Sequence, residues 1–142
     1  MVNTIDLIKE MKEYAEDNNV PIITDEGINY IRNYIKENKI KRILEVGTAI
    51  GYSSILMALT DEEITITTIE RDEKRYLEAV KNIKKFHLEE RITLLYKDAF
   101  DVELDEEFDL VFIDAAKAQN TRFFEKFSKN LAKQGTIITD NM

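Results

Sequence analysis

The 142-residue chain has no cysteine, one proline, one histidine and four glycines. Without cysteine, neither a disulfide framework nor a thiolate metal site can form, and because this is typical of a reducing compartment we expect a cytoplasmic protein. No apolar run approaches the length of a signal-peptide core or a membrane-spanning helix, so we expect neither export nor membrane insertion. The sequence also has no internal repeat, low-complexity tract or Gly/Ser linker.

The remaining composition is that of a soluble globular chain. Hydrophobic residues make up 44% of it, which is enough to bury a core, and neither the charge nor the glycine and proline content indicates disorder. We expect one domain over residues 1–142, with helices in residues 1–38 and the main core in residues 39–142. A net charge of -8 argues against indiscriminate nucleic-acid binding, because phosphate-driven affinity requires clustered lysine and arginine.

Charge is unevenly distributed in the C-terminal third. Residues 98–109 contain seven acids and no base, whereas residues 122–133 contain four bases and one acid. The four bases follow helical spacing and predict one charged stripe opposite an apolar face: Arg122, Lys126, Lys129 and Lys133. The stripe is either a solvated outer helix face or a docking surface for an anionic partner.

Helical and strand patterns alternate along the chain. Apolar spacing predicts helices around residues 5–15 and 28–35, and strands over 42–46, 64–69, 92–96, 110–113 and 136–139. Further helices are predicted over 52–59, over 73–86 with Asp72 as N-cap, and over 122–131 with Gly135 near its end. This alternation predicts an α/β fold with a doubly wound parallel sheet of five strands.

The first predicted strand leads into a glycine turn, residues 45–53, that opens a helix. In doubly wound folds a nucleotide-like cofactor lies at such a turn, although the spacing here differs from the G-x-G-x-x-G of dinucleotide sites. Because Glu45 would repel a pyrophosphate, a cationic ligand fits better. Gly47 and Gly51 would let the backbone approach that ligand closely.

Glu70 ends the second predicted strand, where a carboxylate can accept hydrogen bonds from two ribose hydroxyls. S-adenosylmethionine has a ribose and a sulfonium but no phosphate, so the turn and Glu70 together indicate this cofactor. Each feature alone has another interpretation, because a tight turn requires glycine without any ligand and Glu70 could be a solvated strand end.

Oxygen-bearing side chains follow the last two predicted strands. Asp114 ends the fourth strand with Lys117 just beyond it, and Asp140 and Asn141 end the fifth. Because the carboxyl ends of parallel strands meet at one edge of a sheet, these side chains can converge. Their oxygens suit magnesium or calcium rather than zinc. The alternative is that the aspartates cap turns and that Lys117 lies on the surface.

Together these motifs resemble the cation-dependent O-methyltransferases, the family that includes catechol and caffeoyl-CoA O-methyltransferases. The resemblance spans nearly the whole chain and implies the Rossmann-like fold of class I methyltransferases. Its matching segments are residues 20–28, 43–53, 112–117 and 139–141. Within the family, residues 41–53 are most similar to the bacterial tRNA 5-hydroxyuridine methyltransferases, which form 5-methoxyuridine at the anticodon wobble position.

The resemblance implies a metal and a general base. Asp114, Asp140 and Asn141 would bind Mg²⁺ or another divalent cation. Lys117 would act as the general base that removes the proton from the acceptor hydroxyl, and Asp114 would also be catalytic. The chemistry agrees, because a cation that chelates two substrate oxygens lowers the pKa of the hydroxyl among them and also that of a neighbouring lysine.

The resemblance also implies how the cofactor is held. Glu70 would bind the ribose, Ser53 the methionine carboxylate, and Asp98 and Ala99 would lie near the adenine. The other implied contacts are Glu45, Gly47, Thr48, Gly51, Tyr52 and Asp114.

The implied chemistry restricts the acceptor to neighbouring oxygens. The resemblance indicates 5-hydroxyuridine in a tRNA anticodon loop, and a small catechol-like substrate is the alternative; a non-catalytic cofactor-binding fragment is a second one. A homodimer without membrane contact is also implied. Complete family members continue past the Asp-Asn pair, so we expect the sheet to be C-terminally incomplete, without a final antiparallel strand pair, and cofactor binding to survive better than catalysis.

Overall fold

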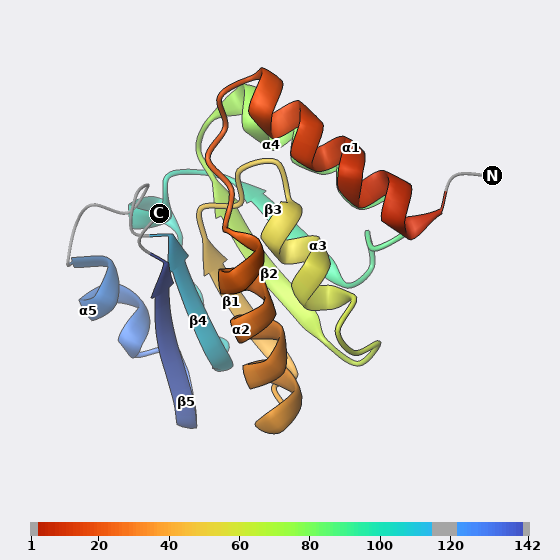
Figure 1. Ribbon diagram of the computed structural model, residues 1–142. Coiled ribbons are helices and arrows are strands. Elements are labelled where there is room, and N and C mark those ends of the chain that lie inside the picture. Colours follow the sequence, from red (N-terminus) through yellow and green to blue (C-terminus); the bar gives the residue numbers. More distant parts are fainter. Residues whose placement is uncertain (1–2, 115–121, 141–142) are drawn as a thin grey trace.

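Strands and helices alternate along the chain in the computed structural model, which describes residues 3–114 and 122–140 (Figure 1). In chain order the elements are α1 (Thr4–Asp17), α2 (Asp25–Glu37), β1 (Arg42–Val46), α3 (Tyr52–Ala58), β2 (Thr65–Glu70), α4 (Glu73–Lys85), β3 (Ile92–Tyr96), the 3₁₀ turn η1 (Ala99–Asp101), β4 (Phe108–Asp114), α5 (Arg122–Ser128) and β5 (Leu131–Asp140). Strands β1 and β3 coincide with the predicted ones, and β2 is displaced by one residue.

The five strands form one sheet in the order β3-β2-β1-β4-β5, and every neighbouring pair is parallel. The chain moves outward from β1 to β3 and then returns to the other side of β1 with β4. This reversal makes the carboxyl ends of β1 and β4 the place where ligands bind in open α/β sheets. The predicted doubly wound parallel sheet is confirmed.

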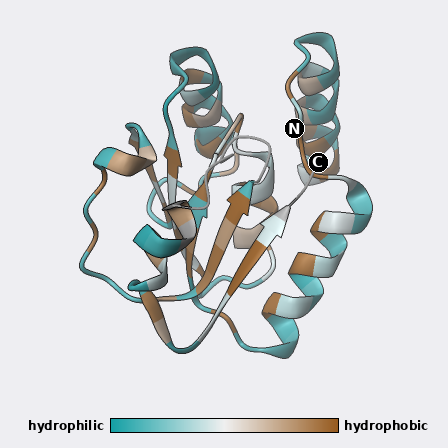
Figure 2. Ribbon diagram, turned by 90° about the vertical axis from the view of Figure 1, so that its left-hand side faces the viewer, coloured by the Kyte–Doolittle hydropathy of each residue, from teal (hydrophilic) through white to brown (hydrophobic). Residues whose placement is uncertain are grey.

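The sheet separates two hydrophobic clusters. The larger one joins the sheet to α1 through α4, with fully buried side chains such as Ile35, Ile55 and Met57. The smaller one lies under α5 and includes Phe123 and Phe127. Figure 1 shows α5 beside β4 and β5, apart from α2, α3 and α4, and Figure 2 shows hydrophobic strands between the helices.

Side-chain caps fix where three helices begin. Asn3, Thr24 and Asp72 each accept a hydrogen bond from a backbone N–H in the first turn of α1, α2 and α4. The cap on α4 was predicted, and it is confirmed by a 2.9 Å bond from the Arg75 N–H to Asp72. Such caps typically contribute about 1 kcal/mol each because they satisfy an otherwise unpaired donor.

The prediction of a helix over residues 122–131 is wrong at its C-terminal end. Helix α5 ends at Ser128, and Leu131 already pairs with Phe108 as the first residue of β5. Gly135 therefore lies inside a strand rather than after a helix, opposite the register shift between Phe108 and Leu110. A Cβ at Gly135 would lie 3.0 Å from two backbone oxygens, so this irregular pairing requires glycine.

The predicted basic stripe is not one helix face, because Lys129 and Lys133 lie beyond α5. Lys126 and Lys129 instead form ion pairs with Glu103 of the acidic segment, at 3.3 and 3.5 Å. His87 is exposed and follows Phe86, the C-cap of α4. Among the described residues, none of the helices combines the length and the apolar character needed to cross a membrane.

Candidate cofactor site

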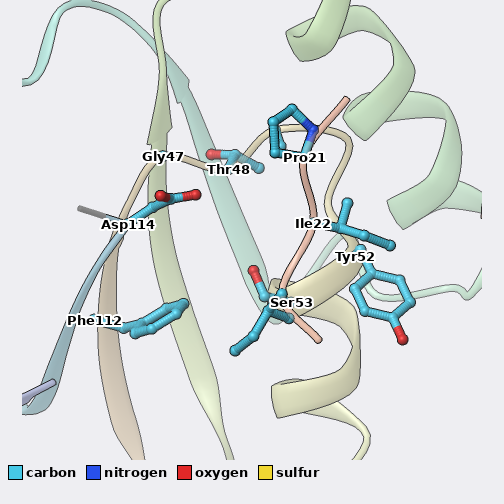
Figure 3. A pocket seen from close by; sticks show the side chains of 10 residues that line it. Pro21, Ile22, Gly47, Thr48, Tyr52, Ser53, Phe112 and Asp114 are labelled. Carbon is cyan, nitrogen blue, oxygen red and sulfur yellow. The ribbon is translucent and has the colours of Figure 1, made fainter. Parts of the chain in front are cut away.

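A pocket opens at the carboxyl ends of β1 and β4 (Figure 3). Asp114 and Phe112 of β4 lie on one side of it, and Tyr52 and Ser53 at the start of α3 on the other. The remaining lining residues are Pro21, Ile22, Ile23, Gly47, Thr48 and Ala49. The pocket therefore brings together five residues predicted to contact the cofactor: Gly47, Thr48, Tyr52, Ser53 and Asp114.

The turn between β1 and α3 enters the left-handed region three times in five residues. Gly47, Ala49 and Gly51 have φ angles of 98°, 51° and 90°. The two glycines adopt this conformation at no steric cost, but an alanine loses about 1–2 kcal/mol there. The Ile69 carbonyl of β2 accepts hydrogen bonds from the N–H groups of Gly47 and Thr48, at 2.9 and 3.2 Å. The turn is thus strained and attached to β2.

Glu70, the predicted ribose ligand, is 5% exposed at the end of β2. One carboxylate oxygen accepts a 2.7 Å hydrogen bond from the Ala49 N–H, and the other accepts a 3.0 Å bond from the Asp72 N–H. Each oxygen keeps a second lone pair, so the carboxylate can still accept from ligand hydroxyls. Glu70 therefore connects the turn to the start of α4.

Glu45 is fully buried beneath the turn. Its carboxylate accepts hydrogen bonds from the hydroxyls of Ser53 and Ser54, and from Thr68 at 2.7 Å. Thr68 lies 2.6 Å from the Thr48 hydroxyl. Glu45 was predicted to contact the cofactor, yet the structure surrounds it with hydroxyl groups of β2 and α3. This geometry makes Glu45 an anchor for the turn and places Ser53, unlike Glu45, on the pocket wall.

The residues expected near the adenine lie beyond β3. Asp98 caps η1 by accepting from the Phe100 N–H at 2.9 Å, and its carboxylate lies 3.8 Å from the Arg71 guanidinium. Ala99 is 7% exposed. Arg71 directly follows Glu70, so Asp98 lies close to the residue predicted to bind the ribose. Neither Asp98 nor Ala99 lines the pocket at Asp114.

Tyr52 begins α3 and is 2% exposed. Burial raises the pKa of its phenol, the cations Lys12 and Arg32 oppose that shift, and Asp25 adds to it. The neutral phenol is therefore the form that the fold favours. The side chain contributes both to the pocket wall and to the larger hydrophobic cluster.

The predicted metal site is only partly within the described residues. Asp114 is 4% exposed at the end of β4, and the backbone register pairs it with Asp140 of β5. The strand ends therefore meet as expected. Asn141 and the predicted base Lys117 lie outside the described residues. Over residues 3–114 and 122–140, no three acidic or histidine side chains are close enough together to hold a metal ion.

Sequence reasoning missed several polar residues that hold the turn. Asn82 is 4% exposed on α4 and donates to the Ile50 carbonyl at 2.8 Å. Thr68 and Ser54 are both fully buried against Glu45. A signal was present for Asn82, because it follows Ala79 by three positions and so lies on the apolar stripe of its helix.

Comparison with known proteins defines the class. The crystal structure of a proposed caffeoyl-CoA O-methyltransferase from Staphylococcus aureus matches 94% of this chain and 65% of its own. The identity is 41% and the TM-score is 0.88. The structure of an O-methyltransferase from Bacillus cereus in complex with SAH matches 99% of this chain and 68% of its own, with 27% identity and a TM-score of 0.86. The fold is thus the Rossmann-like fold of class I methyltransferases.

The sequence comparisons define the family. The profile of the O-methyltransferase family matches residues 2–142, so the chain belongs to this family. A catechol O-methyltransferase from Niastella koreensis is 37% identical over 110 residues, covering 72% of this chain and 49% of the relative. A caffeoyl-CoA O-methyltransferase from Populus kitakamiensis is 29% identical over 92% of this chain and 58% of its own. The chain therefore spans about half to three fifths of these curated relatives.

Proposed function

We propose that the protein transfers a methyl group from S-adenosylmethionine to a hydroxyl group that neighbours a second oxygen. The observation that carries this proposal is the pocket formed by the turn after β1 and by Asp114 at the end of β4. Membership of the O-methyltransferase family supports it, as does the SAH bound to the similar protein from Bacillus cereus.

The cofactor would lie across the turn. In this proposal Glu70 accepts hydrogen bonds from the ribose hydroxyls while its carboxylate holds Ala49 and Asp72. The cofactor contacts the turn and the start of α3 at Gly47, Thr48, Gly51 and Tyr52. Ser53 binds the methionine carboxylate. The absence of a side chain at Gly47 allows the backbone to approach the ligand. Asp98 and Ala99 border the adenine.

The residues at the strand ends fit a hard cation in their chemistry. Asp114 lines the pocket and its register partner is Asp140, so residues with oxygen ligands on two strands are adjacent in the backbone. Asp114, Asp140 and Asn141 would hold Mg²⁺ or a related cation. When bound, the cation supplies positive charge that lowers the pKa of an acceptor hydroxyl.

The proposed reaction is a displacement in which atoms and electrons balance. The acceptor oxygen, having lost its proton to Lys117, attacks the methyl carbon, so the oxygen–carbon bond forms as the sulfur–carbon bond breaks. The electron pair of that bond moves to sulfur, and S-adenosylhomocysteine leaves. Holding the nucleophile and the methyl group in line can supply on the order of 7–11 kcal/mol of the barrier reduction.

For the acceptor we propose 5-hydroxyuridine at the wobble position of tRNA, whose O5 neighbours the O4 carbonyl. The similarity of residues 41–53 to the tRNA-modifying branch supports this acceptor. A catechol-like small molecule is the second candidate, which the names of the catechol and caffeoyl-CoA relatives favour. The net charge of -8 also favours the small molecule.

Paired acceptors decide between the candidates. The protein is incubated with S-adenosylmethionine, Mg²⁺ and either catechol or an anticodon stem-loop that carries 5-hydroxyuridine, and methylated products are identified by mass spectrometry. Product from the stem-loop alone supports the tRNA acceptor, and product from catechol alone supports the second candidate. The proposed enzymatic function is wrong if neither acceptor is methylated while titration calorimetry detects no binding of S-adenosylmethionine. Asp114→Asn and Lys117→Ala are the matched inactive variants.

A further inference from the structure

Asn82 lies outside the pocket, yet its side chain reaches the backbone of the turn between β1 and α3, residues 47–51, which we call the cofactor turn. It is 4% exposed in the third turn of α4 and is not among the residues that line the pocket. Its amide nitrogen donates a 2.8 Å hydrogen bond to the carbonyl of Ile50, which lies between Ala49 and Gly51. A buried asparagine that donates to a backbone oxygen 32 positions away fixes the distance between two elements.

The Ile50 carbonyl depends on this bond. Ile50 is fully buried, so water cannot satisfy its oxygen. Within residues 3–114 and 122–140, the Asn82 amide is the donor to that oxygen. A buried carbonyl without a donor loses free energy comparable to a hydrogen bond, so removal of the amide favours other turn conformations.

The turn needs such external support because its backbone is strained. Ala49 has a φ of 51°, between the left-handed glycines at 47 and 51. Unfavourable backbone angles persist only where the surrounding structure holds them in place. Glu70 fixes the Ala49 N–H from β2, and Asn82 fixes the Ile50 carbonyl from α4. The two bonds therefore hold the turn on both sides of the peptide group that joins Ala49 to Ile50.

Helix α4 is also in close contact with the turn. A Cβ placed on Gly51 would lie 3.6 Å from the Cα of Ala79, one turn of helix before Asn82. Glu70 meanwhile holds the N–H of Asp72, the N-cap of α4. The helix is therefore attached to the turn at its start through Glu70 and, about 15 Å further along its axis, through Asn82.

We infer that Asn82 is a positioning residue for S-adenosylmethionine: it holds the turn in the conformation that presents Gly47, Thr48 and Gly51 to the cofactor. This inference rests on the proposed function. If only a fraction of the molecules has the binding-competent turn conformation, the apparent affinity for the ligand is reduced by that fraction. Loss of the Asn82 bond therefore weakens cofactor binding without removing any atom that touches the cofactor.

The chain offers a matched control for this role. Asn130 is 3% exposed and its amide nitrogen also donates to backbone carbonyls, those of the half-buried Leu104 and the exposed Glu106, at 2.8 and 2.9 Å. These carbonyls lie in the connection before β4, and neither Asn130 nor its acceptors line the pocket. Asn82→Ala and Asn130→Ala thus remove the same type of bond at two places.

The experiment measures the dissociation constant of S-adenosylhomocysteine by titration calorimetry for the wild type, Asn82→Ala, Asn130→Ala and the nearly isosteric Asn82→Asp. We expect about tenfold weaker binding for both Asn82 variants, which corresponds to ~1.4 kcal/mol, and unchanged binding for Asn130→Ala. Equal affinity of the wild type and Asn82→Asp, or equal weakening by Asn82→Ala and Asn130→Ala, would overturn the inference.

A second measurement separates this inference from the proposed function. Amide hydrogen exchange of Ala49 is followed by NMR without any ligand, because it reports how often the turn opens. Faster exchange of Ala49 in Asn82→Asp than in the wild type supports the role of Asn82 in holding the turn; if the wild type nevertheless binds no cofactor, it is the proposed function that fails. Unchanged exchange of Ala49 in that variant would overturn the inference independently.

Discussion

The carboxylate of Glu70 holds the backbone N–H of Ala49 at 2.7 Å, and Ala49 is the non-glycine residue that the cofactor turn forces into the left-handed region. The residue proposed to bind the ribose therefore also stabilises the strained peptide beside it. In the proposed binding mode, the two oxygen atoms that hold the backbone would also recognise the ligand.

Replacement of Glu70 by glutamine should reduce both stability and cofactor affinity. The Glu70 carboxylate accepts from the N–H groups of Ala49 and Asp72, and the amide nitrogen of glutamine cannot accept from whichever of the two it faces. We therefore expect the free energy of unfolding to fall by about 1–3 kcal/mol. Urea unfolding and calorimetry with S-adenosylhomocysteine measure the two effects. Glu62→Gln, an exposed position, is the control and should change neither. Wild-type affinity in Glu70→Gln would contradict its role as the ribose ligand.

Thr68→Val tests the hydroxyl cluster beneath the turn. Valine keeps the shape of threonine but removes the hydroxyl that donates to Glu45 and lies 2.6 Å from Thr48. We expect a loss of about 1–3 kcal/mol, because a buried carboxylate loses a hydrogen bond. The control is Thr67→Val, on the other face of the same strand, whose hydroxyl makes no hydrogen bond within the described part of the chain. Equal stability of the two variants would refute the role of the cluster.

The left-handed positions of the turn predict opposite responses to a methyl group. Gly51→Ala has space for its Cβ, 3.6 Å from the nearest atom, but it keeps a φ of 90° and should lose about 1–2 kcal/mol. Ala49→Gly removes similar strain and so should stabilise the folded state. The larger conformational entropy of glycine in the unfolded state offsets about 0.5–1 kcal/mol of that stabilisation. Thermal and urea unfolding of both variants measure the contrast. A stable Gly51→Ala would show that the turn can rearrange freely.

Gly135→Ala should destabilise the pairing of β5 with β4. The new Cβ would lie 3.0 Å from the carbonyl oxygens of Ala132 and Phe108, and backbone atoms cannot move aside as flexible side chains do. We expect a loss of about 1–3 kcal/mol, as in overpacked cores. Gln134→Ala, the exposed neighbour, should stay within about 0.5 kcal/mol of the wild type in the same urea titration.

Alkaline conditions should destabilise the protein through Tyr52. Burial raises the pKa of this phenol above its ordinary value, so the stability that it contributes is complete below about pH 10 and is lost as the pH rises through the folded pKa. Urea unfolding at pH 8 and above pH 10 should show a larger alkaline loss for the wild type than for Tyr52→Phe. Tyr30→Phe, at a position that is 64% exposed, should behave like the wild type.

Much of the fold was predictable because local patterns agree with the tertiary structure. The strand at residues 42–46 and the cap at Asp72 are encoded by apolar runs and by a local hydrogen bond. The end of α5 was not predictable, because Leu131 continues the helical spacing but its partner, Phe108, is distant in sequence. Gly135 likewise has the position expected of a helix end, and only the opposing strand reveals its role.

The candidate site was predictable where motifs carry the chemistry and less so where packing does. Gly47, Thr48, Tyr52, Ser53 and Asp114 meet in one pocket because strand ends and a glycine turn fix their places. The hydroxyl partners of Glu45 and the bond from Asn82 depend on how β2 and α4 pack against the turn, which spacing alone does not determine.

Both hydrophobic clusters reach both sides of the proposed site. On the β4 side, Phe112 belongs to the larger cluster and Ile113 to the smaller one; on the side of the turn, Ile50 belongs to the larger cluster and Val46 to the smaller one. Sub-global opening follows the extent of buried apolar contact. Detachment of α5, which covers the smaller cluster, would therefore disturb the glycine turn and Asp114 together, so we expect loss of the donor pocket and of the acceptor side in a single event.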